Sequence, residues 1–449
     1  MTHTPPKALT DADRNWRRFV LFRVLFNSRF YYPVLAVLFL DLGLTATEYT
    51  LLNFAWALAI VFTDLPAGAL ADRIGRKPLV VAAAAFMVLE MILLAMAPRN
   101  GGLVLLLCCL GNRILSGMAE GMASGADEAL VFDSLAERGR SQEWPKVLDQ
   151  VMRWQAVGMV IAMLVGGATY DPIFMTRLAS FVGVDFRFTQ DWTLRFPIYF
   201  TLVNGIAALA LSISLREPKK KRQVTPENVN LVKAELSAWH LVTNAGSWIL
   251  KTPVALFVIA AGVLIDSVVR IFLTLSSSYY RIVELPEASF GIIGAVFGGL
   301  GIVTSPIARR MVAKNSLLTN YALIAGTVLM SLVGVSLRWK YWGVIFLLPL
   351  GWAFMALGFM VSYYLNAIVD SERRATVLSF KGVAFNLGYG FISLVFALVL
   401  RAVRDGASTQ EAVSRGLAFL PLWIVFAVVI CAGYFGRQHG ALSAKISNP

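Results

Sequence analysis

The feature that most constrains this chain is a series of apolar runs, each about 20 residues long, that recur along the whole sequence. A helix needs about 20 predominantly apolar residues to cross the hydrocarbon core of a bilayer. The sequence offers twelve such runs and therefore predicts twelve transmembrane helices. The predicted spans are 19–41, 48–69, 78–97, 103–125, 151–169, 195–215, 254–276, 288–307, 317–337, 341–365, 382–403 and 417–436.

The composition places these runs in a membrane rather than in a soluble core. Hydrophobic residues make up 57% of the 449 positions and charged residues only 15%, which is more apolar surface than a soluble domain could bury. The alternating strands of an outer-membrane barrel are not visible, and helices satisfy their own backbone groups in lipid. We therefore expect an all-α membrane protein. No short apolar core with a small-residue cleavage site opens the sequence, so the first span is expected to remain in the mature protein.

The distribution of the basic residues predicts how the protein is oriented. The net charge is +13, and most of the 40 Lys and Arg residues lie in the two tails and in the even-numbered connections between spans. Cytoplasmic connections carry such an excess of basic residues. Both termini are thus expected in the cytoplasm of a bacterium, with the chain crossing the inner membrane many times. The excess charge then faces anionic lipid, and no nucleic-acid partner is expected.

One long connection divides the spans into two sets of six. It covers residues 216–253, begins with a basic cluster and continues with apolar residues at helical spacing, which is typical of an amphipathic helix at the membrane interface. The predicted organisation is a six-helix bundle over 1–215, this cytoplasmic linker over 216–253, and a second six-helix bundle over 254–449. Two such sets indicate parallel repeats related by an axis along the membrane normal.

A motif between the second and third spans carries the most specific signal. Residues 68–77 read GALADRIGRK, with Gly68, Asp72, Arg73, Gly75, Arg76 and Lys77 at the defined positions. This segment resembles the signature loop of the major facilitator superfamily, G-x-x-x-D-R-x-G-R-K. The physical reading is that Gly68 permits close helix approach, Gly75 permits a tight turn, and the acid can form a switchable cluster with the three cations. The resemblance implies that Asp72 meets the positive end of the eleventh helix and locks the cytoplasmic gate in the outward-open state.

Two weaker motifs bear on which member of the superfamily this is. Arg113 and Gly117 in the fourth span resemble the family motif R-x-x-Q-G, with Ser116 in place of the glutamine. Gly158, Gly166 and Gly167 fit the frame of the antiporter motif G-x-x-x-G-P-x-x-G-G, but its proline is missing. The overall pattern resembles drug-exporter-like members.

Ionisable residues near the centres of spans are the candidate site residues. Each costs about 2.5 to 3.5 kcal/mol on insertion scales and so needs a partner, a wet cavity or a function. Arg29, Arg113, Asp266 and Arg270 hold such positions. The family resemblance implies that the first, fourth, seventh and tenth spans line a central cavity. We therefore predict that Arg29, Arg113 and Arg270 bind substrate, with Tyr32 and Tyr363 as candidates for stacking on it.

Proton coupling in the spans would have to use carboxylates, because all three histidines lie outside them. Asp266 and Glu120 are the candidates. Asp266 lies four residues before Arg270, so a purely structural ion pair remains an equal alternative. Glu90, in the middle of the third span, has no role in this scheme.

Three functions remain open from the sequence. No nucleotide-binding P-loop is found, so a primary pump is not expected. No zinc-ligand spacing is found either, so we expect no metalloenzyme and no bound cofactor. The leading hypothesis is a monomeric secondary transporter that exports an amphipathic organic compound in exchange for protons. The alternatives are a uniporter or symporter of an organic anion, because arginines outnumber the predicted acids, and a non-transporting scaffold or sensor with the same fold.

Overall fold

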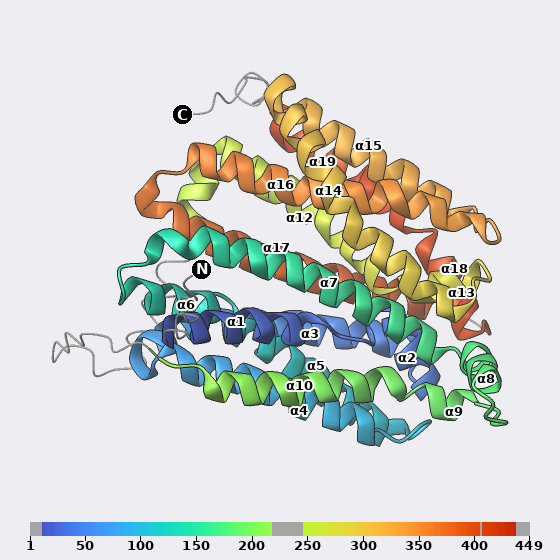
Figure 1. Ribbon diagram of the computed structural model, residues 1–449. Coiled ribbons are helices and arrows are strands. Elements are labelled where there is room, and N and C mark those ends of the chain that lie inside the picture. The colour runs from blue at the N-terminus through green and yellow to red at the C-terminus, as the bar shows by residue number, and fades with distance from the viewer. Residues whose placement is uncertain (1–10, 218–245, 405, 437–449) are drawn as a thin grey trace, which may run out of the picture.

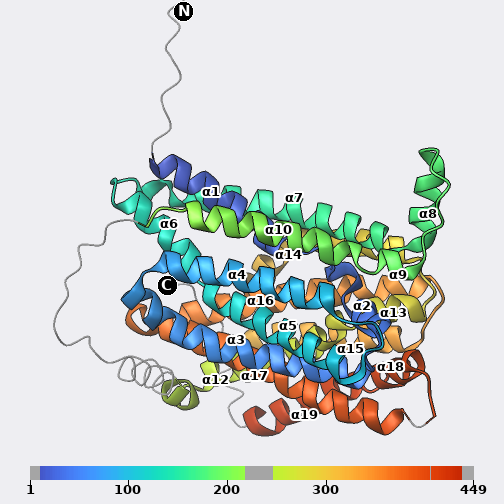
Figure 2. The ribbon, with the colours of Figure 1, turned by 90° about the horizontal axis from the view of Figure 1, so that it is seen from below.

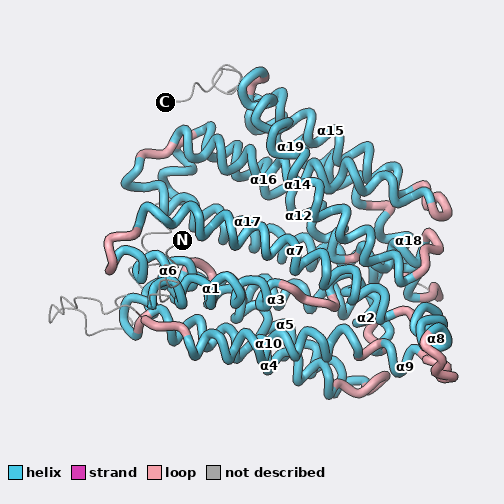
Figure 3. Tube along the Cα trace, viewed as in Figure 1, coloured by secondary structure: helices cyan, strands magenta, loops and turns pink. Residues whose placement is uncertain are grey.

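The computed structural model describes residues 11–217, 246–404 and 406–436, and in these ranges it consists of helices joined by loops, with no strand (Figure 3). In the first half of the chain the helices are α1 Asp11–Asn27, η1 Tyr32–Val34, α2 Leu35–Leu42, α3 Ala46–Ile74, α4 Arg76–Met96, α5 Gly102–Ala123, α6 Ala126–Ala136, η2 Ser141–Glu143, α7 Trp144–Tyr170, α8 Pro172–Phe181, α9 Gln190–Thr193 and α10 Phe196–Ser214. In the second half they are α12 Pro253–Thr274, α13 Ser276–Ile282, η3 Glu287–Ser289, α14 Phe290–Lys314, α15 Leu317–Ser336, η4 Trp342–Phe346, α16 Leu347–Ile368, α17 Ser371–Val403, α18 Thr409–Leu417 and α19 Leu420–Phe435.

The all-α membrane fold is confirmed. Within the described residues, eleven helical stretches are long and apolar enough to cross a membrane. They correspond to the second to twelfth predicted spans. The first span is present as α1, η1 and α2, so the twelve-span prediction is compatible with the structure.

The first span differs from the prediction because it is broken in its middle. Helix α1 ends at Asn27, and helical structure resumes only at Tyr32. Pro33 explains the interruption: it lacks a backbone N–H, and in a continuous helix its ring would clash with the carbonyl group of Arg29, four residues earlier. The break places Arg29 in a non-helical stretch at the centre of the bundle.

Two long helices extend beyond the apolar runs that predicted them. Helix α3 continues to Ile74 and α17 begins at Ser371, so both include charged residues that a hydropathy criterion excludes. The segment 70–74, predicted as part of the loop between the second and third spans, therefore belongs to the end of α3. Most of the linker prediction, residues 218–245, lies outside the described residues, and the division at 215 and 253 stays a prediction.

The helices pack in two groups that meet along a limited set of contacts (Figures 1 and 2). Helices α1 to α10 pack mainly on one another and are here called the N-terminal half. Helices α12 to α19 do the same and form the C-terminal half. The halves meet where α3 lies along α17 and where α7 lies against α14.

The bundle has two ends, which we name by their helices. The terminal face carries the start of α1 and the end of α10, and the opposite face carries α8, α9, α13 and α18 (Figure 1). At the opposite face the halves are in close contact: a Cβ at Gly167 of α7 would lie 2.6 Å from the backbone nitrogen of Gly291 in α14. Two turns further along α14, Gly298 has no atom within 4 Å of its Cβ position. The pair α7 and α14 is therefore tightly packed only towards the opposite face.

Candidate functional site

A cluster of charges forms around the break in the first span. The guanidinium group of Arg29 is hydrogen-bonded to Glu90 of α4, and both residues are fully buried. Its other terminal nitrogen lies 3.7 Å from Glu120 of α5. The Glu120 side chain is 35% exposed, whereas that of Glu90 is 0% exposed. Arg29 thus lies between one acid that is sealed in the bundle and one that is accessible.

Aromatic rings complete the surroundings of Arg29. Its guanidinium carbon lies 6.0 Å from the ring centre of Tyr32 and 5.5 Å from that of Phe26. Arg29 and Tyr32, two of the predicted substrate-binding residues, therefore lie next to each other. In this conformation Arg29 itself is buried, so its predicted role in substrate binding stays a prediction.

Arg113 of α5 is held by an amide and two rings. It donates a hydrogen bond of 2.7 Å to the side-chain oxygen of Asn53 in α3. Its guanidinium carbon lies 5.4 Å from the ring centre of Trp56 and 6.0 Å from that of Phe39. These contacts compensate the desolvated cation by a charge-assisted hydrogen bond and cation–π attraction.

A second charge cluster lies in the C-terminal half. Asp266 and Arg270 of α12 form an ion pair of 2.8 Å, as their spacing predicted. Arg270 also donates to the side-chain oxygen of Asn386 at 3.0 Å and lies 5.3 Å from the ring centre of Tyr389, both in α17. The ion pair is therefore tied to the helix that contacts the other half.

An edge-to-face aromatic pair joins Arg113 to the charge cluster of the C-terminal half. The rings of Trp56 in α3 and Tyr389 in α17 have centres 6.0 Å apart. Since Arg113 lies over the first ring and Arg270 over the second, the four residues form a continuous series across the interface, which we call the arginine–aromatic bridge. It brings two of the predicted substrate-binding arginines to the same place, where the two halves meet.

Tyr363 does not share this arrangement. Its ring stacks on Phe359 at 6.3 Å and meets Tyr364 at 5.4 Å, so its described ring contacts lie within its own helix, α16. This is a packing arrangement, and the stacking role proposed for Tyr363 stays a prediction.

Sequence reasoning missed several members of the site. Glu90 was visible as a charge in mid-span but had no assigned partner, because its pairing with Arg29 depends on the helix break. Trp56, Tyr389, Asn53 and Asn386 gave no signal, since aromatic and amide residues are common inside helices. What identifies them is their contact with an arginine.

The signature segment, residues 68–77, contacts two other parts of the N-terminal half at the terminal face. Gly75 separates α3 from α4 with φ of +100°, as a tight turn requires, and a Cβ there would lie 2.5 Å from the carboxylate of Glu217. The backbone nitrogen of Arg76 donates to Glu217 at 2.6 Å, and its guanidinium group pairs with Asp133 of α6. Helix α6 and the segment after α10 are thus anchored on this turn.

The other motif residues are placed as follows. Gly68 has no atom within 4 Å of its Cβ position, so the close helix approach expected there is not made in this conformation. Arg73 is exposed and Lys77 is half-buried. The side chain of Asp72 lies outside the described residues, so the proposed lock on the eleventh helix stays a prediction.

Another ion cluster joins the halves at the opposite face. Arg281 of α13 donates to both carboxylate oxygens of Asp41 in α2, at 2.6 and 2.5 Å, and to Glu287 at 2.7 Å. The hydroxyl group of Tyr170 donates to the same Asp41 at 2.6 Å. Burial opposes the charge of Arg281, yet Asp41 and Glu287 outweigh it and raise the pKa of Arg281 above its usual value. We call these four residues the opposite-face cluster.

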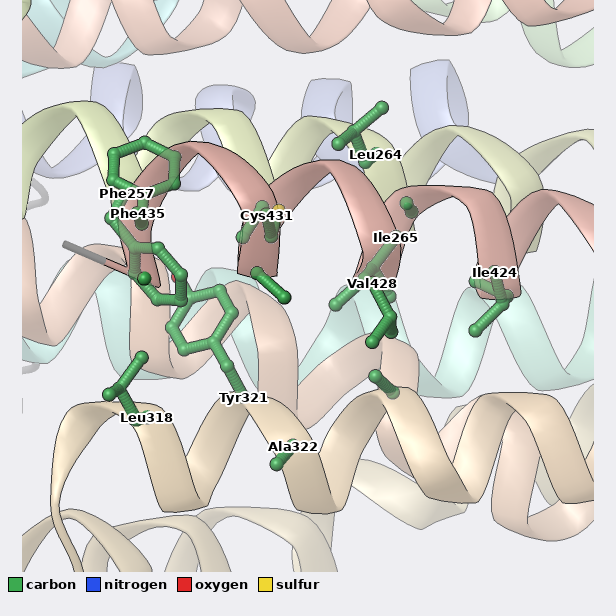
Figure 4. A pocket seen from close by; sticks show the side chains of 15 residues that line it. Phe257, Leu264, Ile265, Leu318, Tyr321, Ala322, Ile424, Val428, Cys431 and Phe435 are labelled. Carbon is green, nitrogen blue, oxygen red and sulfur yellow. The ribbon is translucent and has the colours of Figure 1, made fainter. Parts of the chain in front are cut away.

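An apolar groove on the C-terminal half is separate from all of these charges. It has a volume of about 390 Å³ and lies between α12, α15 and α19 (Figure 4). Phe257, Tyr321 and Phe435 close one end, and aliphatic side chains line the rest. Among the described residues, no group of three or more His, Cys, Asp or Glu is placed to hold a metal ion.

Comparison with known proteins shows where this architecture recurs. The family described as Major Facilitator Superfamily matches residues 19–393. The quinolone resistance protein NorA of Staphylococcus aureus is 25% identical over 203 residues, which cover 45% of each chain. The chain thus spans less than half of the length of the curated relatives it matches.

Solved structures share the fold over nearly the whole chain. The nucleoside transporter NupG has a TM-score of 0.69 at 12% identity, covering 96% of this chain and 99% of its own. A bacterial homologue of the human lysosomal transporter Spinster, in an inward-facing and unoccupied conformation, has a TM-score of 0.68 at 14% identity, covering 97% and 98%. The inward-open xylose transporter XylE from E. coli has a TM-score of 0.59 at 14% identity, covering 93% and 96%.

Proposed function

Because the chain belongs to the major facilitator superfamily, we propose that it is a secondary transporter that works by alternating access and exports an amphipathic organic compound in exchange for protons. The observation that carries this proposal is the arginine–aromatic bridge. It places charged and aromatic groups from both halves at their interface, deep within membrane-spanning helices. A substrate held there contacts both halves and so can link its own binding to their relative movement.

The nature of the exposed groups supports an amphipathic substrate. The half-buried ring of Trp56 at the bridge suits a flat apolar body, and the partly exposed Glu120 suits a cationic group. The resemblance to the quinolone resistance protein NorA supports export. A substrate with an aromatic body and a positive charge satisfies both features.

A second candidate is uniport or symport of an organic anion. It is favoured by Arg270, whose side chain is 25% exposed while that of its partner Asp266 is 8% exposed. Glu90 weakens this candidate, because it adds a buried acid that compensates Arg29. With Glu90 counted, the excess of central arginines over central acids is smaller than the sequence analysis assumed.

The proton-coupling part of the proposal rests on Asp266 and Glu120. Each is an acid within a membrane-spanning helix with an arginine next to it, at 2.8 Å for Asp266 and 3.7 Å for Glu120. Both members of each pair belong to the same half, so movement of the halves relative to one another would change the exposure of the acid to water, and with it the proton affinity of the acid. We further propose a monomer in the bacterial inner membrane with both termini in the cytoplasm, and a gate at the signature motif.

Purified protein in proteoliposomes provides the test. We expect counterflow of a lipophilic cationic dye, and accumulation of that dye when a proton gradient of the correct direction is imposed. Accumulation should collapse when the gradient is dissipated, while counterflow should persist. Arg153→Gln, which alters an exposed ion pair within α7, is the matched control and should behave as wild type.

Different outcomes point to the different candidates. Counterflow of an organic anion but not of the dye would favour the second candidate. Absence of counterflow with any probe of either charge, in folded protein, would contradict transport and leave a scaffold or sensor.

A further inference from the structure

Arg29 has two acidic neighbours but carries only one positive charge. It is hydrogen-bonded to Glu90 and lies 3.7 Å from Glu120, beyond hydrogen-bonding distance. The three groups together carry one net negative charge when both acids are ionised. Since Glu90 is fully buried and Glu120 is 35% exposed, the uncompensated charge falls on Glu120.

Burial explains why Arg29 favours Glu90. An isolated carboxylate in a low-dielectric interior carries a large desolvation penalty, and a partly hydrated carboxylate carries a much smaller one. Arg29 therefore stabilises the protein more when it pairs with Glu90 than when it pairs with Glu120. The cation of α5, Arg113, lies two helical turns from Glu120 and is already paired with Asn53 and the ring of Trp56.

We propose that Glu90 is a positioning residue: by holding Arg29, it keeps the partly exposed Glu120 available to bind the cationic group of a substrate. Glu90 touches no substrate in this scheme. The inference rests on the proposed function for its substrate class, organic cations, and it adds the residue that keeps an acid available to bind them. It also gives a role to Glu90, a fully buried acid in mid-span that the transport scheme did not use.

Removing the Glu90 charge has a specific consequence. In Glu90→Gln, Arg29 loses its buried partner and lies next to Glu120, which it then neutralises by pairing. In Arg29→Met/Glu90→Gln, the buried pair is replaced by uncharged side chains of similar size, and Glu120 is left without a cation. The single variant should therefore lose the available negative charge, and the double variant should recover it.

The first measurement needs no substrate. A water-soluble carbodiimide with an added amine labels accessible carboxyl groups, and mass spectrometry of the purified full chain gives the labelled fraction at Glu120. We expect labelling to fall several-fold in Glu90→Gln and to return to at least the wild-type level in the double variant. Asp127→Asn, which breaks another buried pair, with Arg23, is the matched control and should leave labelling of Glu120 unchanged.

The second measurement uses tetraphenylphosphonium, a lipophilic cation of fixed charge, and an uncharged analogue of similar size. Binding of the cation should weaken about tenfold in Glu90→Gln, a change of about 1.4 kcal/mol, and recover in the double variant. Binding of the uncharged analogue should change little in either variant. Glu120→Gln should bind the cation weakly whatever residue stands at position 90.

The outcomes separate this inference from the proposed function. Equal labelling of Glu120 in wild type and Glu90→Gln would overturn the inference, as would a double variant that labels less than wild type. The comparison of the double variant with wild type remains informative even if Glu90→Gln fails to fold. If labelling and cation binding change among the variants as expected but the protein shows no counterflow, transport would be contradicted and the role of Glu90 supported.

Discussion

At the scale of single residues, the site depends on how each charge inside the membrane is compensated. Arg29 is paired with an acid, Arg113 with an amide and two rings, and Arg270 with both an acid and a ring. Each arrangement offsets the insertion cost of about 2.5 to 3.5 kcal/mol in a different way. The compensation by rings is the weakest, at about 0.5 to 2 kcal/mol, and therefore the easiest for a substrate to replace.

Asp266→Asn tests the coupling role at this scale. The substitution keeps the size of the side chain and removes its titration. We expect gradient-driven accumulation to be abolished and counterflow to be retained, because counterflow needs no net proton movement. Both are measured in proteoliposomes, with Asp149→Asn, from an exposed pair, as the control. Full accumulation in the Asp266 variant would move the coupling role to Glu120, and loss of both activities together with stability would indicate a structural ion pair.

At the scale of elements, the breaks between helices position the charges. The interruption at Pro33 turns Arg29 into the bundle, and the one-residue turn at Gly75 joins α3 to α4. At Gly75 the backbone has φ of +100° and ψ of 165°, a region that is essentially restricted to glycine. The turn also leaves no room for a side chain beside Glu217.

Gly75→Ala should therefore destabilise the protein by about 1 to 3 kcal/mol from backbone strain alone, with a further loss from displacing Glu217. Gly139→Ala is the matched control, because Gly139 has φ of +68° but open space around its Cβ position. We expect a clearly larger drop in the thermal unfolding midpoint for Gly75→Ala than for Gly139→Ala. Equal drops would mean that neither the backbone region of Gly75 nor its contact with Glu217 adds to the cost of a positive φ.

At the scale of the whole molecule, the structure is closed at the opposite face. The opposite-face cluster joins α2 and α13, and backbone N–H groups of Ala36 and Val37 donate to the Ser277 hydroxyl across the same interface. Together with the contact of Gly167 and Gly291, these interactions favour the present arrangement of the halves. Alternating access requires that they break in the other state.

Arg281→Gln should shift the population towards a state that is open at the opposite face, since it removes the cation that pairs with Asp41 and Glu287. Spin labels at Ser180 and Lys340, both exposed at this face, should report a larger fraction of long distances. Arg415→Gln breaks an exposed pair inside α18 at the same face and serves as the control. An unchanged distance distribution in Arg281→Gln would show that the cluster does not bias the equilibrium.

The orientation in the membrane is also a property of the whole molecule. Single cysteines at Gln142 and Ser180, both exposed and at different ends of the bundle, should react oppositely with an impermeant thiol reagent in a cysteine-free background. The expected result is labelling of Ser180Cys from outside intact cells and of Gln142Cys only after the membrane is permeabilised. The reverse pattern would contradict termini in the cytoplasm.

Fold class, approximate spans and family could all be predicted from the sequence, because each depends on local properties. A run of apolar residues shows whether it can cross a bilayer without reference to the rest of the chain. The pairing of Asp266 with Arg270 was accessible for the same reason, since spacing along one helix predicts the contact. The turn at Gly75 was also predicted correctly from the motif, although α3 extends to the residue before it.

The pairing of charges from different helices, in contrast, became visible only in three dimensions. Arg29 and Glu90 are 61 residues apart, and Trp56 and Tyr389 lie in different halves. Hydropathy along the chain says nothing about which face of one helix meets which face of another, and it does not detect that Pro33 breaks the first span. These contacts depend on how helices pack around one another in three dimensions, which is why the partner of Arg29 was not predicted while its position inside the membrane was.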